Sequence, residues 1–221
     1  MPEFFAGLDL GQAHDYTALA IAEVVAVPTG ELEPIPGSHV VDPDGRSRPV
    51  THEKTAQRYD LRYLHRFPLN TPYPDIVAAV AALLGREPLG GADVTLALDF
   101  TGVGRPIFDL FAKARLRGTL VPVTIHGGDA ASRDGRGWRV PKRELISATQ
   151  VLLQTGRLRI APALAEAETL VRELADYRVK ISASGHDSYD AREGQHDDVV
   201  LTVALAAWTS ERGRPRGWAS A

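Results

Sequence analysis

A short unbroken apolar run at Val94–Leu98, with the sequence VTLAL, constrains the fold more than any other feature of this chain. Strands that alternate apolar and polar residues cover one face of a sheet, whereas a continuous apolar run suits a strand buried on both faces. Such strands are typical of parallel sheets with helices on either side. The chain is therefore expected to fold around an α/β sheet that contains this strand.

The other patterns predict antiparallel strands first and a strand–helix alternation afterwards. Two apolar runs joined by a polar turn, Phe4–Leu10 and Thr17–Val27, predict adjacent strands. Further strands are predicted at Tyr59–Arg66, Leu120–Ile125, Leu158–Ile160 and Tyr177–Ala183, and helices beginning at Pro74, Pro106, Pro141, Pro162 and His196. This order indicates a mixed sheet with helices on both faces.

The segment Pro28–Thr51 is rich in Pro, Gly, Asp and Ser and interrupts that order. Its composition predicts a loop or an excursion from the core. It is longer than most connections in compact domains, which leaves two alternatives: a segment that orders on a partner, or one that carries a small hairpin. We expect one domain over residues 1–211, with a loop or insertion at 28–58, followed by a disordered tail at 212–221.

Composition excludes several kinds of site. The chain has no cysteine, which excludes disulfides, cysteine-zinc sites and cysteine nucleophiles. No apolar run is long enough to span a bilayer. The formal net charge of −3 restricts nucleic-acid binding to local patches. One patch comprises Arg133, Arg136, Arg139, Lys142 and Arg143, although clusters of this size are more often plain solvated surface.

Carboxylates occur at three comparable positions. Asp9 lies inside the first apolar strand, Asp99 directly follows VTLAL, and the pair Asp197-Asp198 opens the last apolar helix. Right-handed crossovers make the strands of Asp9 and Asp99 neighbours, and sites gather at the carboxyl ends of parallel strands. Each acid alone also suits a structural role, as a satisfied strand acid, a turn acid or a helix N-cap.

Taken together, these acids point to a metal centre. Carboxylates within a few ångströms of one another cannot all stay ionised without a cation. Sets of oxygen ligands favour magnesium or manganese, and two such ions about 4 Å apart are a common device for phosphodiester hydrolysis. Gly7 and Gly11, on either side of Asp9, are expected to leave room for a cation and a phosphate backbone.

Three stretches make the sequence resemble a known family: GLDLGQAHDYTALAI, ALDFTGVGRPIFDLF and GQHDDVVLTVALAAW. They resemble the nuclease domain of phage terminase large subunits, a DNA-packaging branch of the RNase H-like superfamily, and the resemblance extends over about Phe4–Trp208. It implies an RNase H-like α/β fold with a central mixed five-stranded sheet flanked by helices. An additional hairpin or edge strand would precede the last helix.

The resemblance also implies a site and an activity. The catalytic triad would be Asp9, Asp99 and Asp198, with Asp197 as a further metal ligand and His196 and Asp15 in supporting roles. The implied activity is endonuclease cleavage of double-stranded DNA by water, with two Mg²⁺ or Mn²⁺ ions. The basic residues between 133 and 143 would contact phosphates, which positions a duplex without reading its bases.

The family context implies partners as well: DNA, a terminase ATPase domain, a small subunit and a portal, in the cytoplasm of a bacterial host and away from membranes. The motif G-x-x-x-x-G-K-[ST] of an ATP-driven motor is absent from the sequence. Two alternatives stay open: a nuclease domain excised from a complete motor, or a free-standing protein of prophage type.

Two other functions stay open. A D-x-G motif followed by a hairpin also begins actin-like phosphotransferases, but those proteins need a second such loop, which this sequence lacks. A non-catalytic DNA-binding or assembly domain could keep the same fold, although retention of all the acids argues against it.

Overall fold

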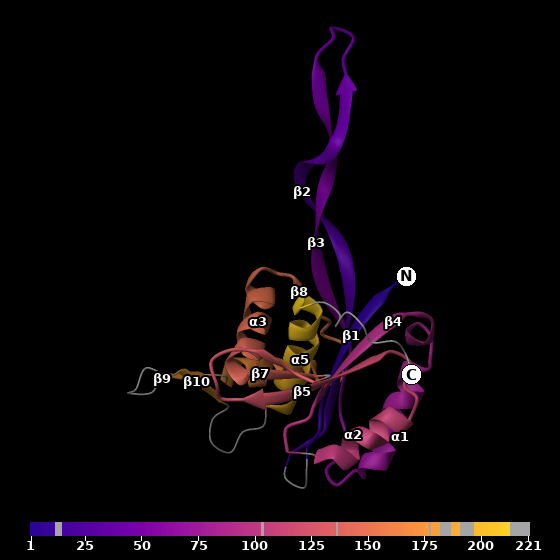
Figure 1. The fold of residues 1–221 in the computed structure, drawn as a ribbon. Coiled ribbons are helices and arrows are strands. Elements are labelled where there is room, and N and C mark those ends of the chain that lie inside the picture. Colours follow the sequence, from indigo (N-terminus) through magenta and orange to yellow (C-terminus); the bar gives the residue numbers. More distant parts are fainter. Residues whose placement is uncertain are drawn as a thin grey trace.

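The computed structural model describes residues 1–11, 15–102, 104–135, 137–176, 178–181, 187–190 and 197–212. The strands are β1 (Glu3–Asp9), β2 (Ala18–Val41), β3 (Ser47–Arg66), β4 (Asp93–Asp99), β5 (Thr119–His126), β6 (Ser132–Asp134), β7 (Gly137–Pro141), β8 (Leu158–Ile160), β9 (Arg178–Ile181) and β10 (Asp187–Asp190). The helices are α1 (Tyr73–Leu84), α2 (Gly104–Lys113), α3 (Lys142–Gln154), α4 (Ala167–Asp176) and α5 (Asp198–Arg212), with a short 3-10 helix at Leu89–Gly91. Figure 1 shows a body of strands and helices from which one long hairpin projects.

Within the described residues, eight strands form one mixed sheet in the order β6-β7-β5-β4-β1-β2-β3-β8. β1, β4, β5 and β7 run parallel to one another, whereas β2 is antiparallel to both β1 and β3. The predicted α/β fold, a central mixed sheet flanked by helices, is confirmed, and the hairpin β9–β10 precedes the last helix as expected.

The sheet is larger than the five strands predicted. β7 and β6 extend one side and β8 the other, and β6 lies within a segment that looked like a Gly-rich basic loop. β8 has the bounds of the strand predicted at Leu158–Ile160, whereas β6, with three residues, carries too few alternations for a sequence pattern to reveal it.

The two faces of the sheet have separate cores. One core contains side chains of α3, α4 and α5, and the other contains side chains of α1 and α2. α5 is the most enclosed of these helices, because every residue from Asp198 to Ser210 is buried. It packs against β1, β2 and α3, so the start of this helix is fixed relative to the centre of the sheet.

α5 lies directly on β1 at Gly7. A Cβ atom at this position would lie 1.9 Å from the carbonyl oxygen of Thr202, so only glycine allows the helix and the strand to come this close. Our expectation that Gly7 leaves room for a cation was wrong, because the space is filled by the backbone of α5. Gly11 likewise serves a tight turn, since a Cβ atom there would lie 2.1 Å from the carbonyl oxygen of Asp15.

β2 and β3 continue far beyond the sheet as a two-stranded arm (Figure 1). β1 covers β2 only as far as Val24, whereas β2 and β3 stay paired up to Val41 opposite Ser47. The segment 28–58 is therefore a hairpin, the second of the two alternatives for it. Pro28 and Pro34 coincide with register shifts, and Pro43 lies in the turn between the two strands. An exposed two-stranded ribbon tolerates the missing N–H donor of a proline.

No helix in the described part of the chain is long and apolar enough to cross a membrane. α5 ends at Arg212, and the rest of the predicted tail, residues 213–221, lies outside the described residues.

We predict that Gly7→Ala destabilises the protein by at least about 1–3 kcal/mol, the usual effect of overpacking a core, because the added methyl group meets backbone that cannot move aside. Urea unfolding followed by circular dichroism measures this change. The matched control is Gly127→Ala, where no atom lies within 4 Å of the new Cβ, so no loss of stability is expected. Equal stability of the two variants would contradict the close helix–strand contact.

Candidate metal centre

The fold brings the predicted acids together at one edge of the sheet. Asp9 and Asp99 are the last residues of β1 and β4, which pair in parallel with Leu8 opposite Leu98, so the two acids lie side by side. Their carboxyl groups share a hydrogen bond. Asp198 is the first residue of α5, which the contact at Gly7 holds against β1.

The environment of these acids opposes ionisation. Burial raises the pKa of Asp9 well above its usual range, and the negative charges of Asp99, Asp198 and Asp197 raise it further. Asp9 keeps some solvent contact, yet most of its surroundings are protein atoms. A hydrogen bond between two carboxyl groups requires a proton on one of them, in line with the raised pKa of Asp9.

Asp99 is held in place by the turn that follows it. The backbone N–H of Thr101 donates a hydrogen bond of 2.8 Å to Oδ1 of Asp99. Burial raises the pKa of Asp99, while hydrogen bonds from Thr101 and the positive charge of Lys142 lower it. The carboxyl of Asp99 is thus oriented by its own backbone, leaving its other oxygen for Asp9 or for a cation.

Lys142, predicted as a phosphate contact, lies among the acids. Its Nζ is 2.8 Å from Oδ2 of Asp197, and both side chains are about three-quarters buried or more. As the first residue of α3, it carries a positive charge into a cluster that otherwise consists of carboxylates. A role toward a phosphate group stays a prediction.

Glu173 is a member of this neighbourhood that the sequence reasoning missed. Burial is the main cause that raises the pKa of Glu173 to about 7, and the negative charges of Asp198 and Asp197 also raise it. A hydrogen bond from the backbone N–H of Val200 and the positive charge of Arg66 act in the opposite direction and lower the pKa. The signal was available, because Glu173 lies on the face of α4 that also carries the buried Leu170. An acid within an apolar helix face needs a partner elsewhere in the fold.

The remaining predicted residues do not form one patch. Arg133 stacks on the ring of Trp138 at 4.0 Å, and Arg139 is the next residue along β7 and so faces the other side of the sheet. Arg143 binds the side chain of Asp129 at 2.8 Å. Asp15 is exposed in the turn after β1, and His196 and Arg136 lie outside the described residues.

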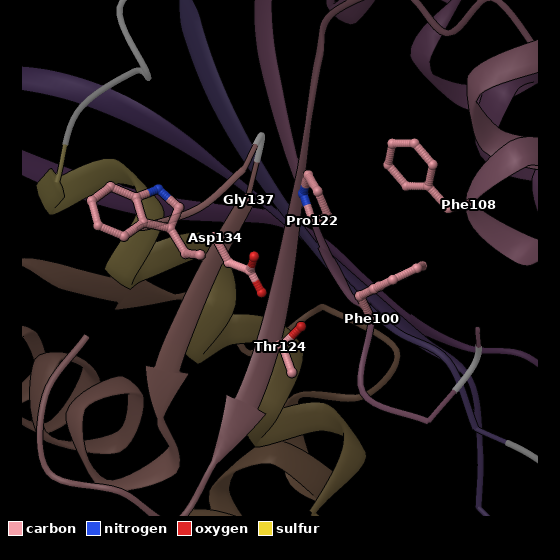
Figure 2. Close-up of a pocket in the computed structure, with 7 residues that line it drawn as sticks. Phe100, Phe108, Pro122, Thr124, Asp134 and Gly137 are labelled. Atoms are coloured by element: carbon pink, nitrogen blue, oxygen red, sulfur yellow. The ribbon is translucent and has the colours of Figure 1, made fainter. Parts of the chain in front are cut away.

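A pocket of about 430 Å³ lies beside β5, the strand next to β4 (Figure 2). Phe100, Pro122 and Thr124 line it, whereas Val123, opposite Asp99 in the sheet, points into the core beneath α5. Successive residues of a strand face opposite sides. The pocket is therefore separate from the acids.

The donor set suits a hard divalent cation. Asp9, Asp99, Asp197 and Asp198 supply carboxylate oxygens alone, the ligands that magnesium and manganese prefer. In the part of the chain that the structure describes, no three acidic or histidine side chains are already arranged around one point. The fit rests on charge: the negative charges of Asp99, Asp198 and Asp197 raise the pKa of Asp9, and a cation would relieve this repulsion.

No protein-family model and no curated protein sequence matches this chain. Solved structures do. The large terminase nuclease from thermophilic phage G20c with bound magnesium has a TM-score of 0.59 and 21% identity, over 93% of this chain and 80% of that chain. The same values hold for its structure with bound cobalt. The large terminase nuclease domain of Thermus phage P74-26 has a TM-score of 0.54 and 20% identity, over 93% of this chain and 78% of that chain.

The fold is that of a large terminase nuclease. The resemblance noticed in the sequence is thus confirmed at the level of the fold, and identities near 20% show no more than that.

In the metal-free protein, stability is expected to fall as the pH rises between 4.5 and about 7, the ordinary and the raised pKa of Glu173. An acid whose pKa is raised by folding binds its proton more tightly in the native state. Its stabilisation is therefore complete below the ordinary pKa and lost above the raised one. Glu173 contributes at most about 3 kcal/mol, and Asp9 and Asp99 act in the same direction.

Thermal unfolding in EDTA, repeated across this pH range, measures the loss. Glu173→Gln should flatten the curve, and Mg²⁺ or Mn²⁺ should raise the melting temperature more at the upper end of the range than at the lower end, because cations compete with protons for the carboxylates. Stability that rises steadily with pH would contradict the raised pKa values.

Proposed function

We propose that this protein is a metal-dependent DNA endonuclease of the terminase type. The observation that carries the proposal is the group of carboxylates at the carboxyl ends of two adjacent parallel strands and the start of α5: Asp9, Asp99, Asp197 and Asp198. An acid with a structural role needs only one positively charged or hydrogen-bonding partner. These acids instead lie close to one another although their negative charges repel. Such an arrangement is typical of a site that binds cations.

The fold supports the same function. Large terminase nucleases share it, and one of them has been solved with magnesium and with cobalt. We propose that Asp9, Asp99 and Asp198 hold two Mg²⁺ or Mn²⁺ ions and that Asp197 is a further ligand. When bound, such ions activate a water molecule and stabilise the leaving oxygen of a phosphodiester.

The chain's own residues prepare the site for that chemistry. The hydrogen bond from Thr101 fixes the carboxylate of Asp99, so it need not reorient when substrate arrives. Burial of Asp99 and Asp198 keeps bulk water away and strengthens their electrostatic interactions. The ion pair with Lys142, at 2.8 Å, holds the side chain of Asp197 at the start of α3.

Double-stranded DNA is the proposed substrate. Lys142 and Arg143 start α3 next to the acids, and we propose that they contact phosphates, as we also propose for Arg133, Arg136 and Arg139. Asp15 and His196 keep their proposed supporting roles. In the packaging context, an ATPase domain, a small subunit and a portal would be the protein partners, in the cytoplasm of a bacterial host.

We expect the protein to nick or linearise plasmid DNA with Mn²⁺ or Mg²⁺ and to be inactive in EDTA. Asp9→Asn, Asp99→Asn and Asp198→Asn should each reduce the cleavage rate by about a hundredfold or more, since each removes a charge that acts in the transition state. Agarose gels of supercoiled plasmid measure the rate.

Asp109→Asn is the matched control, because Asp109 is an exposed acid on α2. It should cleave like the wild type. The endonuclease proposal would be abandoned if folded wild-type protein at high concentration showed no cleavage with either metal. DNA binding without cleavage would then favour the non-catalytic alternative.

A further inference from the structure

We propose that Glu173 is a positioning residue: its carboxylate caps the start of α5 in place of Asp197, and so leaves Asp197 for the metal centre. This inference rests on the proposed function, because it concerns the same centre. It adds a residue from α4, an element that supplies none of the acids predicted from the sequence.

The first step is that Asp197 occupies the N-cap position of α5. Its carbonyl oxygen accepts the first helical hydrogen bond, from the N–H of Leu201 at 2.9 Å. The N–H groups of the first turn have no acceptor within the helix. When aspartate occupies this position, its own side chain usually accepts one of them, from the residue two or three positions further on.

In this protein another helix supplies that acceptor. The N–H of Val200, three residues after Asp197, donates to Oε2 of Glu173 at 2.9 Å. Glu173 is 27 residues away in the sequence and belongs to α4. A carboxylate near a helix N-terminus is also favoured by the helix dipole. Glu173 thus does for α5 what the side chain of Asp197 would ordinarily do.

The side chain of Asp197 is directed elsewhere. One of its oxygens lies 2.8 Å from Nζ of Lys142, and its charge acts on Asp9. A side chain folded back on the first turn would use its oxygens on N–H groups of its own helix. Capping by Glu173 removes that competition, so Asp197 and Asp198 can both serve the centre although they are consecutive residues at a helix start.

The burial of Glu173 indicates that its carboxylate has a specific role at this position. Only 9% of the residue is exposed, and its second oxygen, Oε1, is buried and accepts no hydrogen bond within the described part of the chain. Burying a half-satisfied carboxylate is costly. An apolar residue would suit this face of α4, beside Leu170, without that cost. The cap on α5 and the positive charge of Arg66 are the observed interactions that offset it.

The test measures Mn²⁺ binding by calorimetry, without DNA, in four variants: Glu173→Gln, Glu173→Leu, Asp197→Asn and the double variant Glu173→Leu/Asp197→Asn. Glutamine keeps an oxygen that can accept from Val200, whereas leucine does not. Glu173→Leu should weaken Mn²⁺ binding about tenfold to a hundredfold, as loss of an outer-shell partner typically does. Glu173→Gln should stay close to the wild-type affinity.

If Glu173 acts through Asp197, the leucine change should have little further effect once Asp197 is asparagine. Hydrogen exchange supplies a second readout, since the amide of Val200 should lose protection in Glu173→Leu and keep it in Glu173→Gln. Glu173→Met, with a more flexible apolar side chain, replaces the leucine variant if that one does not fold. Glu168→Leu, an exposed acid on the same helix, is the control and should change neither readout.

Two results would overturn the inference. Equal losses in the glutamine and leucine variants would mean that the charge of Glu173 is needed, as for a direct ligand. Unchanged Mn²⁺ affinity in a destabilised leucine variant would mean a role in stability alone. If the wild type binds no Mn²⁺, the proposed function fails instead, and protection of the Val200 amide then decides the capping role by itself.

Discussion

The close contact of α5 with β1 is the constraint on which the whole site depends. Gly7 and Asp9 are two residues apart in one strand and so face the same side of the sheet. The helix that lies on Gly7 therefore begins beside Asp9, and its first residue is an acid. Any side chain at Gly7 would lift the helix and separate Asp198 from the other carboxylates. The glycine sets the geometry of the centre without touching it.

Repulsion among the carboxylates is the second theme, and the protein limits it in three ways. The raised pKa of Asp9 favours its protonated form, Lys142 pairs with Asp197, and Glu173 is protonated more readily than an ordinary glutamate. A bound cation would take over part of the same task. Folding, proton binding and metal binding are therefore linked at this site, as expected wherever ligands must lose protons to bind a metal.

The sequence was sufficient to predict features that depend on the residues of a single strand or helix. The run VTLAL predicted a buried parallel strand. The acids at the end of β4 and at the start of α5 predicted the cluster of carboxylates. Features that depend on contact between distant segments were not predictable in this way. The bond between Glu173 and Val200 joins two helices, and the role of Gly7 depends on Thr202. β6 was missed because it is too short to show a period.

The arm formed by β2 and β3 also affects how the protein moves through solution. It extends past Val24 by a length on the order of 50 Å, whereas a compact chain of 221 residues has a radius of gyration of about 17 Å. Friction depends on such an extension more than on mass. A monomer will therefore leave a gel-filtration column ahead of round proteins of equal weight and resemble a dimer. Its subunit number should be read from light scattering, which reports mass independently of shape.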